Sequence, residues 1–382
     1  MALVVAVLVM AWGIRHAHGC EPEACPPRDR ALKTSTDFVQ GSLKNGLSYI
    51  IRQRAQPAGH VRMELCVRAG SMHEPEGVTG VARLLSRLPF TVTSRFAPGQ
   101  ALRRFDEAGI DFDRETGARA DFDATRFTLH LRSNEDAAVE LGLKYLADIA
   151  GGMVFDDVAI EKERRLLLAG DRARVSASQR LIAASFPKIA PGSLLASHPP
   201  DGYPGDAARI TPEQLRALYS VWYRPSRMML LIVGDVEAPE IVEKLGLAFA
   251  PISDRIGLAD PDPGLTPGHA LTPMVVSDPE VRTNTAQWLT FHGRAEPVNT
   301  ESAARRQLVR DLAIESLRRR LARRVATGDI GAPFAIAGSG VAFGIVSYTT
   351  VAVSDDASSW DQLVRALSDE VNAARTLGLS AR

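Results

Sequence analysis

The sequence has no excess of charge of either sign and very few cysteines. Lys and Arg together number 45, as do Asp and Glu, so the formal net charge is zero. No global electrostatic attraction therefore draws the protein to nucleic acid or to an anionic membrane. The three cysteines, Cys20, Cys25 and Cys66, cannot form a four-cysteine zinc site and allow at most one disulfide, whose pairing the sequence leaves open.

Long apolar runs are missing as well. The run from Ala2 to Ile14 is too short to span a bilayer and is typical of the hydrophobic region of a secretion signal, although no basic residue precedes it. We expect residues 1–19 to be a signal or anchor segment of an exported protein, followed by a polar linker over 20–36. A buried N-terminal segment is the alternative. Cleavage after Gly19 would leave Cys20 first, where a lipid could be attached.

The length of the chain favours two domains. A sequence of 382 residues with 45% hydrophobic residues exceeds the usual limit for one core. Residues 251–268 are rich in proline and glycine, which is typical of a linker. We therefore expect one domain over 37–250 and a second over 269–382. The second is short beside the first, so we expect it to be truncated and the chain to be a fragment of a longer protein.

Strand and helix patterns mix without strict alternation, which favours an α+β fold. Alternation predicts strands over 61–71 and 121–133, and continuous apolar runs predict a strand over 228–236. Helices are expected over 80–90, 101–108, 135–151, 156–169, 211–225, 301–326 and 358–376. In the helix over 301–326, core spacing is seen at Leu308, Leu312, Leu317, Leu321 and Val325.

Several segments in sequence order resemble a known family. These are NGLSYIIRQRAQPAG, VRAGSMHEPEGVTGVARLL, FDDVAIEKERRLLL and LRALYSVWYRPSRMMLLIVGDVE. They resemble the first domain of the pitrilysin/insulinase family of inverted zinc metallopeptidases, above all its long periplasmic bacterial members, and APFAIAGSG is similar to the second domain. The resemblance implies the N-terminal half of such a protein in the periplasm. It also implies two α+β domains of similar plan, each a mostly antiparallel sheet packed against helices, that form one half of a clamshell.

The family's chemistry depends on a His-x-x-Glu-His helix. Two histidines bind zinc, the Glu is the general base, and a Glu from a later helix completes the coordination. In this sequence the resemblance places Arg83 and Arg87 at the two histidines, Ser86 at the base and Gly170 at the later ligand. Arginine stays protonated and has no lone pair for a metal. Only Glu163, a supporting acid, is retained, so we expect no catalytic residue, no bound metal and no cofactor, although zinc is expected for the family.

Two interpretations of Arg83 and Arg87 remain open. Without the resemblance they would simply form a solvated helix face. With it they face a chamber, where desolvated guanidinium groups need partners. Glu163 is one candidate partner, and the carboxylate of a bound peptide is another, so the two arginines are candidates for anion binding.

Other chemistries have weaker support. His60, His73, His130, His198, His269 and His292 stand singly, and the nearest thing to a metal cluster is His73 with Glu74 and Glu76. No Gly-x-Ser-x-Gly elbow is present, and the glycines from Gly338 to Gly340 indicate a turn. The many arginines of the helix over 301–326 fit a solvated face better than a nucleic-acid or lipid surface.

The sequence thus predicts a protein without peptidase activity that binds an extended peptide or pairs with an active family member. That member could be a separate subunit or a missing C-terminal half. We expect no nucleic-acid partner, and membrane contact only through the N-terminal segment. An active zinc metallopeptidase with unrecognised ligands and a purely structural assembly protein are the alternatives. The substrate and the oligomeric state stay open.

Overall fold

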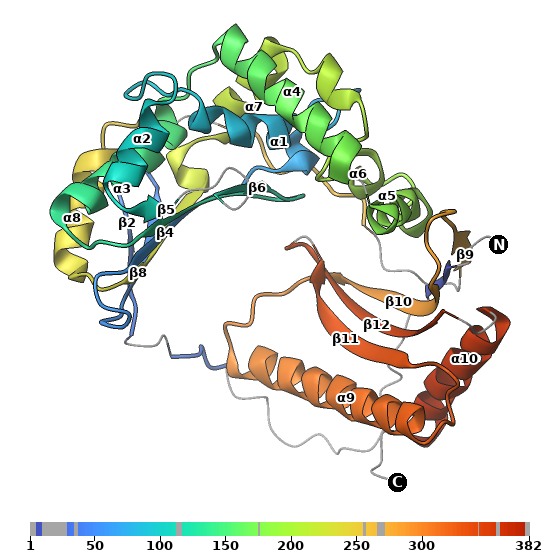
Figure 1. The fold of residues 1–382 in the computed structure, drawn as a ribbon. Helices are drawn as coiled ribbons and strands as arrows, with labels where there is room; N and C mark the ends of the chain where they lie inside the picture. Colours follow the sequence, from blue (N-terminus) through green and yellow to red (C-terminus); the bar gives the residue numbers. More distant parts are fainter. Residues whose placement is uncertain are drawn as a thin grey trace. The chain divides into compact units, whose positions relative to one another are not determined.

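The computed structural model describes residues 5–9, 29–33, 37–111, 117–174, 176–254, 257–265, 272–342, 344–356 and 360–378. The chain divides into two compact units, each described by itself below (Figure 1). The larger unit comprises residues 35–174 and 197–263, and the smaller comprises 1–34, 175–196 and 264–382. Among the described residues, no helix is long and apolar enough to cross a membrane.

The larger unit is built on a seven-stranded sheet with the order β2-β3-β8-β4-β7-β5, in which β6 also pairs with β7. The strands are β2 (Val39–Ser42), β3 (Ser48–Gln53), β4 (Val61–Val67), β5 (Ile110–Asp111), β6 (Ala118–Ala120), β7 (Thr125–Leu131) and β8 (Met228–Gly234). Strand β8 runs parallel to β3 and antiparallel to β4. The sheet is therefore mostly antiparallel, as expected.

Helices cover one face of this sheet (Figure 1). They are α1 (Val81–Arg87), α2 (Gln100–Glu107), α3 (Asp136–Gly151), α4 (Asp157–Arg174), α7 (Pro212–Trp222) and α8 (Ala238–Phe249). Alternation along β4 explains the layering, because Met63 and Leu65 are fully buried against the helices while Arg62 is exposed on the other face. Short helical segments η1 (Ser71–His73), η2 (Leu88–Phe90), η3 (Asp206–Arg209) and η4 (Pro225–Arg227) connect these elements, and α6 (Leu194–Ser197) lies where the chain passes from the smaller unit back to the larger one.

Helix ends follow the capping signals of the sequence. Thr211 caps α7 by accepting the N–H of Gln214 at 3.3 Å, and the Gln214 side chain accepts the N–H of Thr211 at 2.8 Å. Asp156 caps α4 by accepting the N–H of Ala159 at 2.8 Å. Both caps satisfy backbone donors that the first helical turn leaves free, so both predicted helix starts are confirmed.

The smaller unit has a five-stranded sheet with the order β11-β12-β10-β1-β9. Its elements are β1 (Val5–Val9), α5 (Ala177–Ile189), β9 (Thr272–Val276), β10 (Asn284–Arg294), α9 (Glu301–Ala326), β11 (Phe334–Ala342), β12 (Val346–Asp355) and α10 (Trp360–Leu377). Leu317 and Leu321 of α9 pack with Val353 and Leu367 in the core. Buried Glu370 of α10 pairs with two arginines of α9, Arg320 at 2.8 Å and Arg324 at 2.5 Å.

The two units share one plan, as the sequence predicted. Strands β3, β4 and β7 of the larger sheet correspond in order and direction to β9, β10 and β12 of the smaller one. In the larger sheet β8 lies between β3 and β4, and in the smaller sheet β1 lies between β9 and β10. The two inserted strands run in opposite directions relative to their neighbours. Strand β8 is parallel to β3 and antiparallel to β4, whereas β1 is antiparallel to β9 and parallel to β10.

Some expectations differ from the structure. Leu308 and Leu312 of α9 are each 58% exposed, so these two positions of the expected core face are not buried. Gly338 and Gly340 lie inside β11 rather than in a turn, paired with Thr350 and Tyr348. A Cβ at Gly340 would meet the Tyr348 ring at 3.2 Å, so glycine here allows close packing.

The domain boundaries are also drawn differently. Residues 175–196 belong to the smaller unit, because Arg180 of α5 binds Asp278 at 2.8 Å and the α5 side chains Leu181 and Ile189 pack against Met274. Most of the expected signal segment and linker, with Cys20 and Cys25, lies outside the described residues, whereas Val5–Val9 forms β1. Cys66 carries no disulfide within the described part of the chain.

Glu74 stabilises the start of α1. Its carboxylate is 7% exposed and accepts the N–H of Gly80 at 2.9 Å and that of Ala82 at 2.7 Å. Gly80 has φ of 85°, a left-handed conformation that favours glycine, and thereby turns the chain into the helix. Burial raises the pKa of Glu74 to about 8, although the two backbone donors act in the opposite direction.

We predict that Glu74→Gln lowers the free energy of unfolding by about 2 kcal/mol. The amide group would place an N–H donor against a backbone N–H, which leaves one buried donor without an acceptor. Urea unfolding monitored by circular dichroism measures the effect. The matched control is Glu76→Gln, because Glu76 is exposed and two residues away. Equal stability of the two variants would contradict the capping role.

Candidate functional site

Helix α1 carries the candidate positions and is held between other elements of the larger unit. Val81, Leu84, Leu85 and Leu88 are fully buried, which confirms the apolar face expected from the sequence. The helix packs against α4 and α7. The polar positions Arg83 and Arg87 lie on the remaining side, and both residues are partly buried.

Arg87 and Glu163 form a buried ion pair between α1 and α4. The Nε of Arg87 donates to Oε2 of Glu163 at 3.1 Å, and the Arg87 side chain is 17% exposed while that of Glu163 is 0% exposed. The other carboxylate oxygen, Oε1, accepts the hydroxyl of Thr91 at 2.9 Å. Of the two candidate partners for Arg87, the structure thus provides Glu163.

Arg83 and Ser86 make different contacts. Arg83 donates from Nη1 to the backbone carbonyl of Asp201 at 3.0 Å, which ties α1 to the loop before η3. Ser86 is 2% exposed, and its hydroxyl donates to the carbonyl of Arg83 one turn earlier at 2.8 Å. This hydroxyl therefore serves the helix backbone rather than a base or a nucleophile.

Gly170 lies on α4, about two turns beyond Glu163. A Cβ built at this position would have no heavy atom within 4 Å, so there is open space where a longer side chain could stand. The helix continues through it to Arg174.

The side chains at these four positions do not fit a zinc ion. A guanidinium group is protonated and offers no lone pair, and glycine has no side chain to offer. The Ser86 hydroxyl is already used by the helix. In the part of the chain that the structure describes, no group of three or more His, Cys, Asp or Glu side chains is arranged to hold a metal ion.

The loop cluster around His73 has a structural role. His73 accepts the N–H of Gly70 on Nδ1 at 3.1 Å, and its Nε2 lies 3.2 Å from a carboxylate oxygen of Asp260. Burial lowers the pKa of His73, so the ring is neutral and Nε2 carries the proton that Asp260 accepts. Arg227 also binds Asp260 and stacks on Trp222. Asp260 from the proline-rich segment is thereby fixed to the larger unit.

Two histidines that stand apart in the sequence come together in space. His60 follows the loop after β3 and His130 lies on β7, and both line one pocket at the end of the sheet. Sequence spacing gave no indication of this, because cross-strand register rather than helical spacing brings them together. His269 lies outside the described residues.

The arginines of α9 are mostly compensated within the smaller unit. Arg318 and Arg319 bind Glu315, both at 2.7 Å, and Arg306 reaches Glu296 at 3.5 Å. Together with the pairs to Glu370, these contacts favour the interpretation of α9 as a solvated, salt-bridged helix.

Comparison with protein families gives two matches that follow one another along the chain. Residues 49–186 match the model described as insulinase, peptidase family M16, and residues 209–382 match the peptidase M16 inactive domain.

Individual proteins are similar over parts of their length. A probable zinc protease PqqL of Haemophilus influenzae is 28% identical over 56% of this chain and 23% of its own length. That of Escherichia coli is 24% identical over 78% of this chain and 32% of its own length. The chain therefore spans a third or less of these two relatives.

Solved structures share the fold. The crystal structure of the first half of the periplasmic protease PqqL from Escherichia coli superposes with a TM-score of 0.79 at 21% identity, covering 92% of this chain and 75% of that one. The full-length PqqL structure gives a TM-score of 0.80 over 39% of its chain. The two-domain α+β plan expected from the sequence is thereby confirmed.

We predict that Arg87→Ala lowers the free energy of unfolding by about 3 kcal/mol, because it removes the cation that pairs with the fully buried Glu163 carboxylate. The double variant R87L/E163L, which removes both charges, should recover most of this loss. Arg83→Ala is the control and should cost less, since Arg83 donates to the exposed backbone carbonyl of Asp201. Equal losses for Arg87→Ala and Arg83→Ala in urea unfolding would contradict the buried pair.

Proposed function

The chain belongs to the insulinase family of M16 peptidases, and from this premise we propose that it is a non-catalytic member that binds extended peptides. The observation that carries the proposal is the ion pair of Arg87 with fully buried Glu163. On this proposal, the guanidinium group of Arg87 stands where the family has a zinc-binding histidine. It supplies the positive charge that the buried carboxylate needs in the absence of a metal.

The remaining substitutions support the same conclusion. Arg83 replaces the other histidine, Ser86 the catalytic base and Gly170 the later Glu ligand. A single change could adjust a metal site, but these four together remove every ligand and the base. The caps and the core of α1 are retained, which is the pattern of a conserved scaffold with a discarded reaction.

We predict that the purified chain holds no stoichiometric zinc and cleaves no quenched peptide in a chelator-sensitive manner. The variant R83H/S86E/R87H/G170E should bind about one zinc per chain by elemental analysis, since it restores the ligand set of the inverted motif. Gly170 has space for the added side chain. One tightly held zinc in the native chain, with chelator-sensitive cleavage, would overturn the proposal. A folded quadruple variant without zinc would contradict the assignment of these positions.

The proposed peptide site is the free edge of β6. The carbonyl of Gly117 accepts the N–H of Thr128 at 2.7 Å, and the N–H of Asp121 donates to the carbonyl of Ala124 at 2.7 Å. Hydrogen-bonded pairs alternate along an antiparallel ladder, so the opposed residues Arg119 and Arg126, midway between these bonds, direct their backbone groups toward each other. The N–H and C=O groups of Ala118 and Ala120 then point away from β7. Among the described strands, none pairs with this edge. An extended peptide could add here as a further strand, with little demand on its sequence.

We predict that Ala120→Pro weakens binding of a labelled, proline-free peptide pool by about tenfold, because it removes an outward N–H donor. The β6–β7 pairing should persist, since that N–H does not face β7. Gln40→Pro on β2 is the matched control at the opposite edge of the sheet, where Leu43 donating to Leu47 makes Gln40 an outward residue. Fluorescence anisotropy measures binding. Equal effects of the two prolines would contradict binding at β6.

We propose further that the protein is exported to the periplasm and works beside an active family member, either a separate subunit or a further segment of a longer chain. The likeness to a periplasmic protease supports export. Val5–Val9 of the N-terminal apolar run forms β1 of the smaller sheet, which fits the alternative of an N-terminal segment kept in the fold. Co-purification of an active M16 peptidase from the source cells would support the pairing, whereas a monomer that binds peptide unaided would favour independent action.

A further inference from the structure

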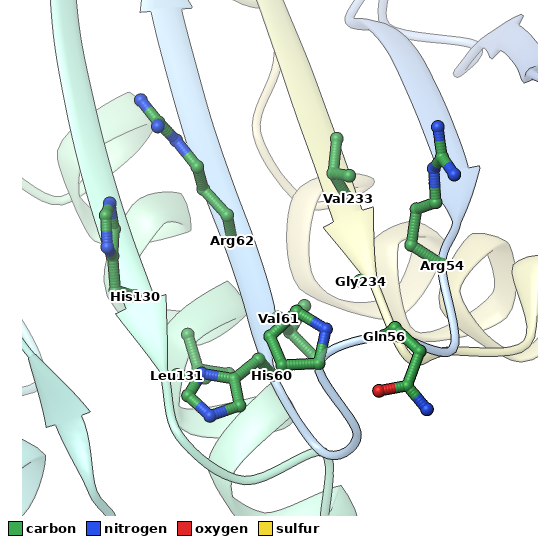
Figure 2. A pocket seen from close by; sticks show the side chains of 10 residues that line it. Arg54, Gln56, His60, Val61, Arg62, His130, Leu131, Val233 and Gly234 are labelled. Atoms are coloured by element: carbon green, nitrogen blue, oxygen red, sulfur yellow. The ribbon is translucent and has the colours of Figure 1, made fainter.

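The larger unit has a pocket of about 310 Å³ at the end of its sheet, and none of its lining residues belongs to α1 (Figure 2). Its lining includes Arg54, His60, Arg62 and His130, and contains no acidic residue. Figure 2 shows these side chains on neighbouring segments, with His130 on β7, Arg62 on β4 and Arg54 just after β3. Basic residues from two stretches of the sequence, residues 54–62 and His130, therefore line one hollow.

Strand register makes this arrangement a consequence of the fold. Arg62 lies directly opposite His130 on β7 and opposite Val233 on β8. Directly opposed residues have Cβ atoms about 5 Å apart and share one face of a sheet. This is the face that the helices leave open, since the alternating residues Val61 and Met63 are buried.

The backbone around the pocket is held in place. Gly59 donates to Oδ2 of Asp235 at 2.9 Å, and Asp235 donates from its N–H to the carbonyl of His60 at 3.0 Å. A Cβ at Gly234 would collide with the same His60 carbonyl, so β8 and the loop approach closely only because residue 234 is glycine. The backbone of His60, which lines the pocket, is thus anchored before any ligand arrives.

The basic side chains have little compensation. Arg54, His60 and His130 make no side-chain hydrogen bond or ion pair with any residue that the structure describes. Arg62 reaches Glu64 at 3.2 Å, but Glu64 also accepts from Thr128 at 3.4 Å and lies 3.9 Å from Arg126. The carboxylate of Asp235 faces Gly59. Positive charge and hydrogen-bond donors are therefore left over at the hollow.

We propose that this pocket binds a compact oxyanion, the phosphate or carboxylate group of a small ligand. Arginine presents a fork of N–H donors that matches two oxygens of such a group, and imidazole N–H groups add single donors. The preformed wall lowers the ordering cost of binding. This inference is independent of the proposed peptide site, because none of these residues lies on α1 or β6.

The test follows the ring signals of histidine by NMR, which is practical because the chain has only eight histidines. His60→Gln and His130→Gln assign the two relevant signals. The intact chain is titrated with sodium phosphate, with sodium acetate, and with sodium chloride at equal ionic strength. We expect saturable shifts of the His60 and His130 signals with an oxyanion and none with chloride. The tighter-binding anion then identifies the ligand group as phosphate or carboxylate.

Variants separate a site from general surface charge. The double variant R54Q/H130Q, which removes two side chains without protein partners, should weaken binding of the preferred anion by about tenfold, the loss expected for charge-assisted hydrogen bonds. Arg103→Gln on α2 is the matched control, an exposed arginine outside the pocket, and should change the affinity less than twofold. Equal shifts with chloride, or equal losses in the control, would overturn the proposal.

Discussion

The insertion of β8 between β3 and β4 is the constraint on which the larger unit depends. The two flanking strands are separated by one short loop, yet they bond to a strand that arrives well over a hundred residues later. Leu230 and Ile232 are fully buried at its centre, so this pairing closes the core. Arg227, just before β8, holds Asp260, and Gly234 at its end shapes the basic pocket. One long-range pairing thus positions several features that are unrelated in sequence.

A second constraint acts at α1, where two buried acidic side chains require hydrogen-bond donors or a cation as partners. Glu74 is satisfied by backbone donors at the start of the helix, and Glu163 by Arg87 and Thr91. A carboxylate with no solvent exposure requires a cation or several donors, because desolvation of an unpaired charge is costly. Within the proposed history of the site, a metal could be lost without destabilising the fold only if another cation took its place. On the proposed function, arginine at position 87 meets that requirement, although a guanidinium group cannot coordinate a metal.

The sequence was sufficient to predict those features of the fold that depend on residues close to one another in the chain. Caps at Asp156 and Thr211, the apolar face of α1 and the alternation of β4 are set by neighbouring residues, and all were predicted. Features set by distant residues were not. Nothing in the spacing of His60 and His130 indicates that β4 and β7 bring them to one pocket. Gly338 and Gly340 suggest a turn, but the need to accommodate Tyr348 across the sheet places them within β11.

The exposed leucines of α9 show why the apolar spacing of a helix does not by itself predict burial. Leu308 and Leu312 have the spacing of core residues, and the pattern alone predicts burial. In the larger unit α1 packs against α4 and α7, whereas in the smaller unit α9 packs mainly on β11. Likewise, β1 stands where β8 would stand, but runs in the opposite direction. Periodicity reports which face of a helix is apolar, and only the surrounding elements decide whether that face is covered.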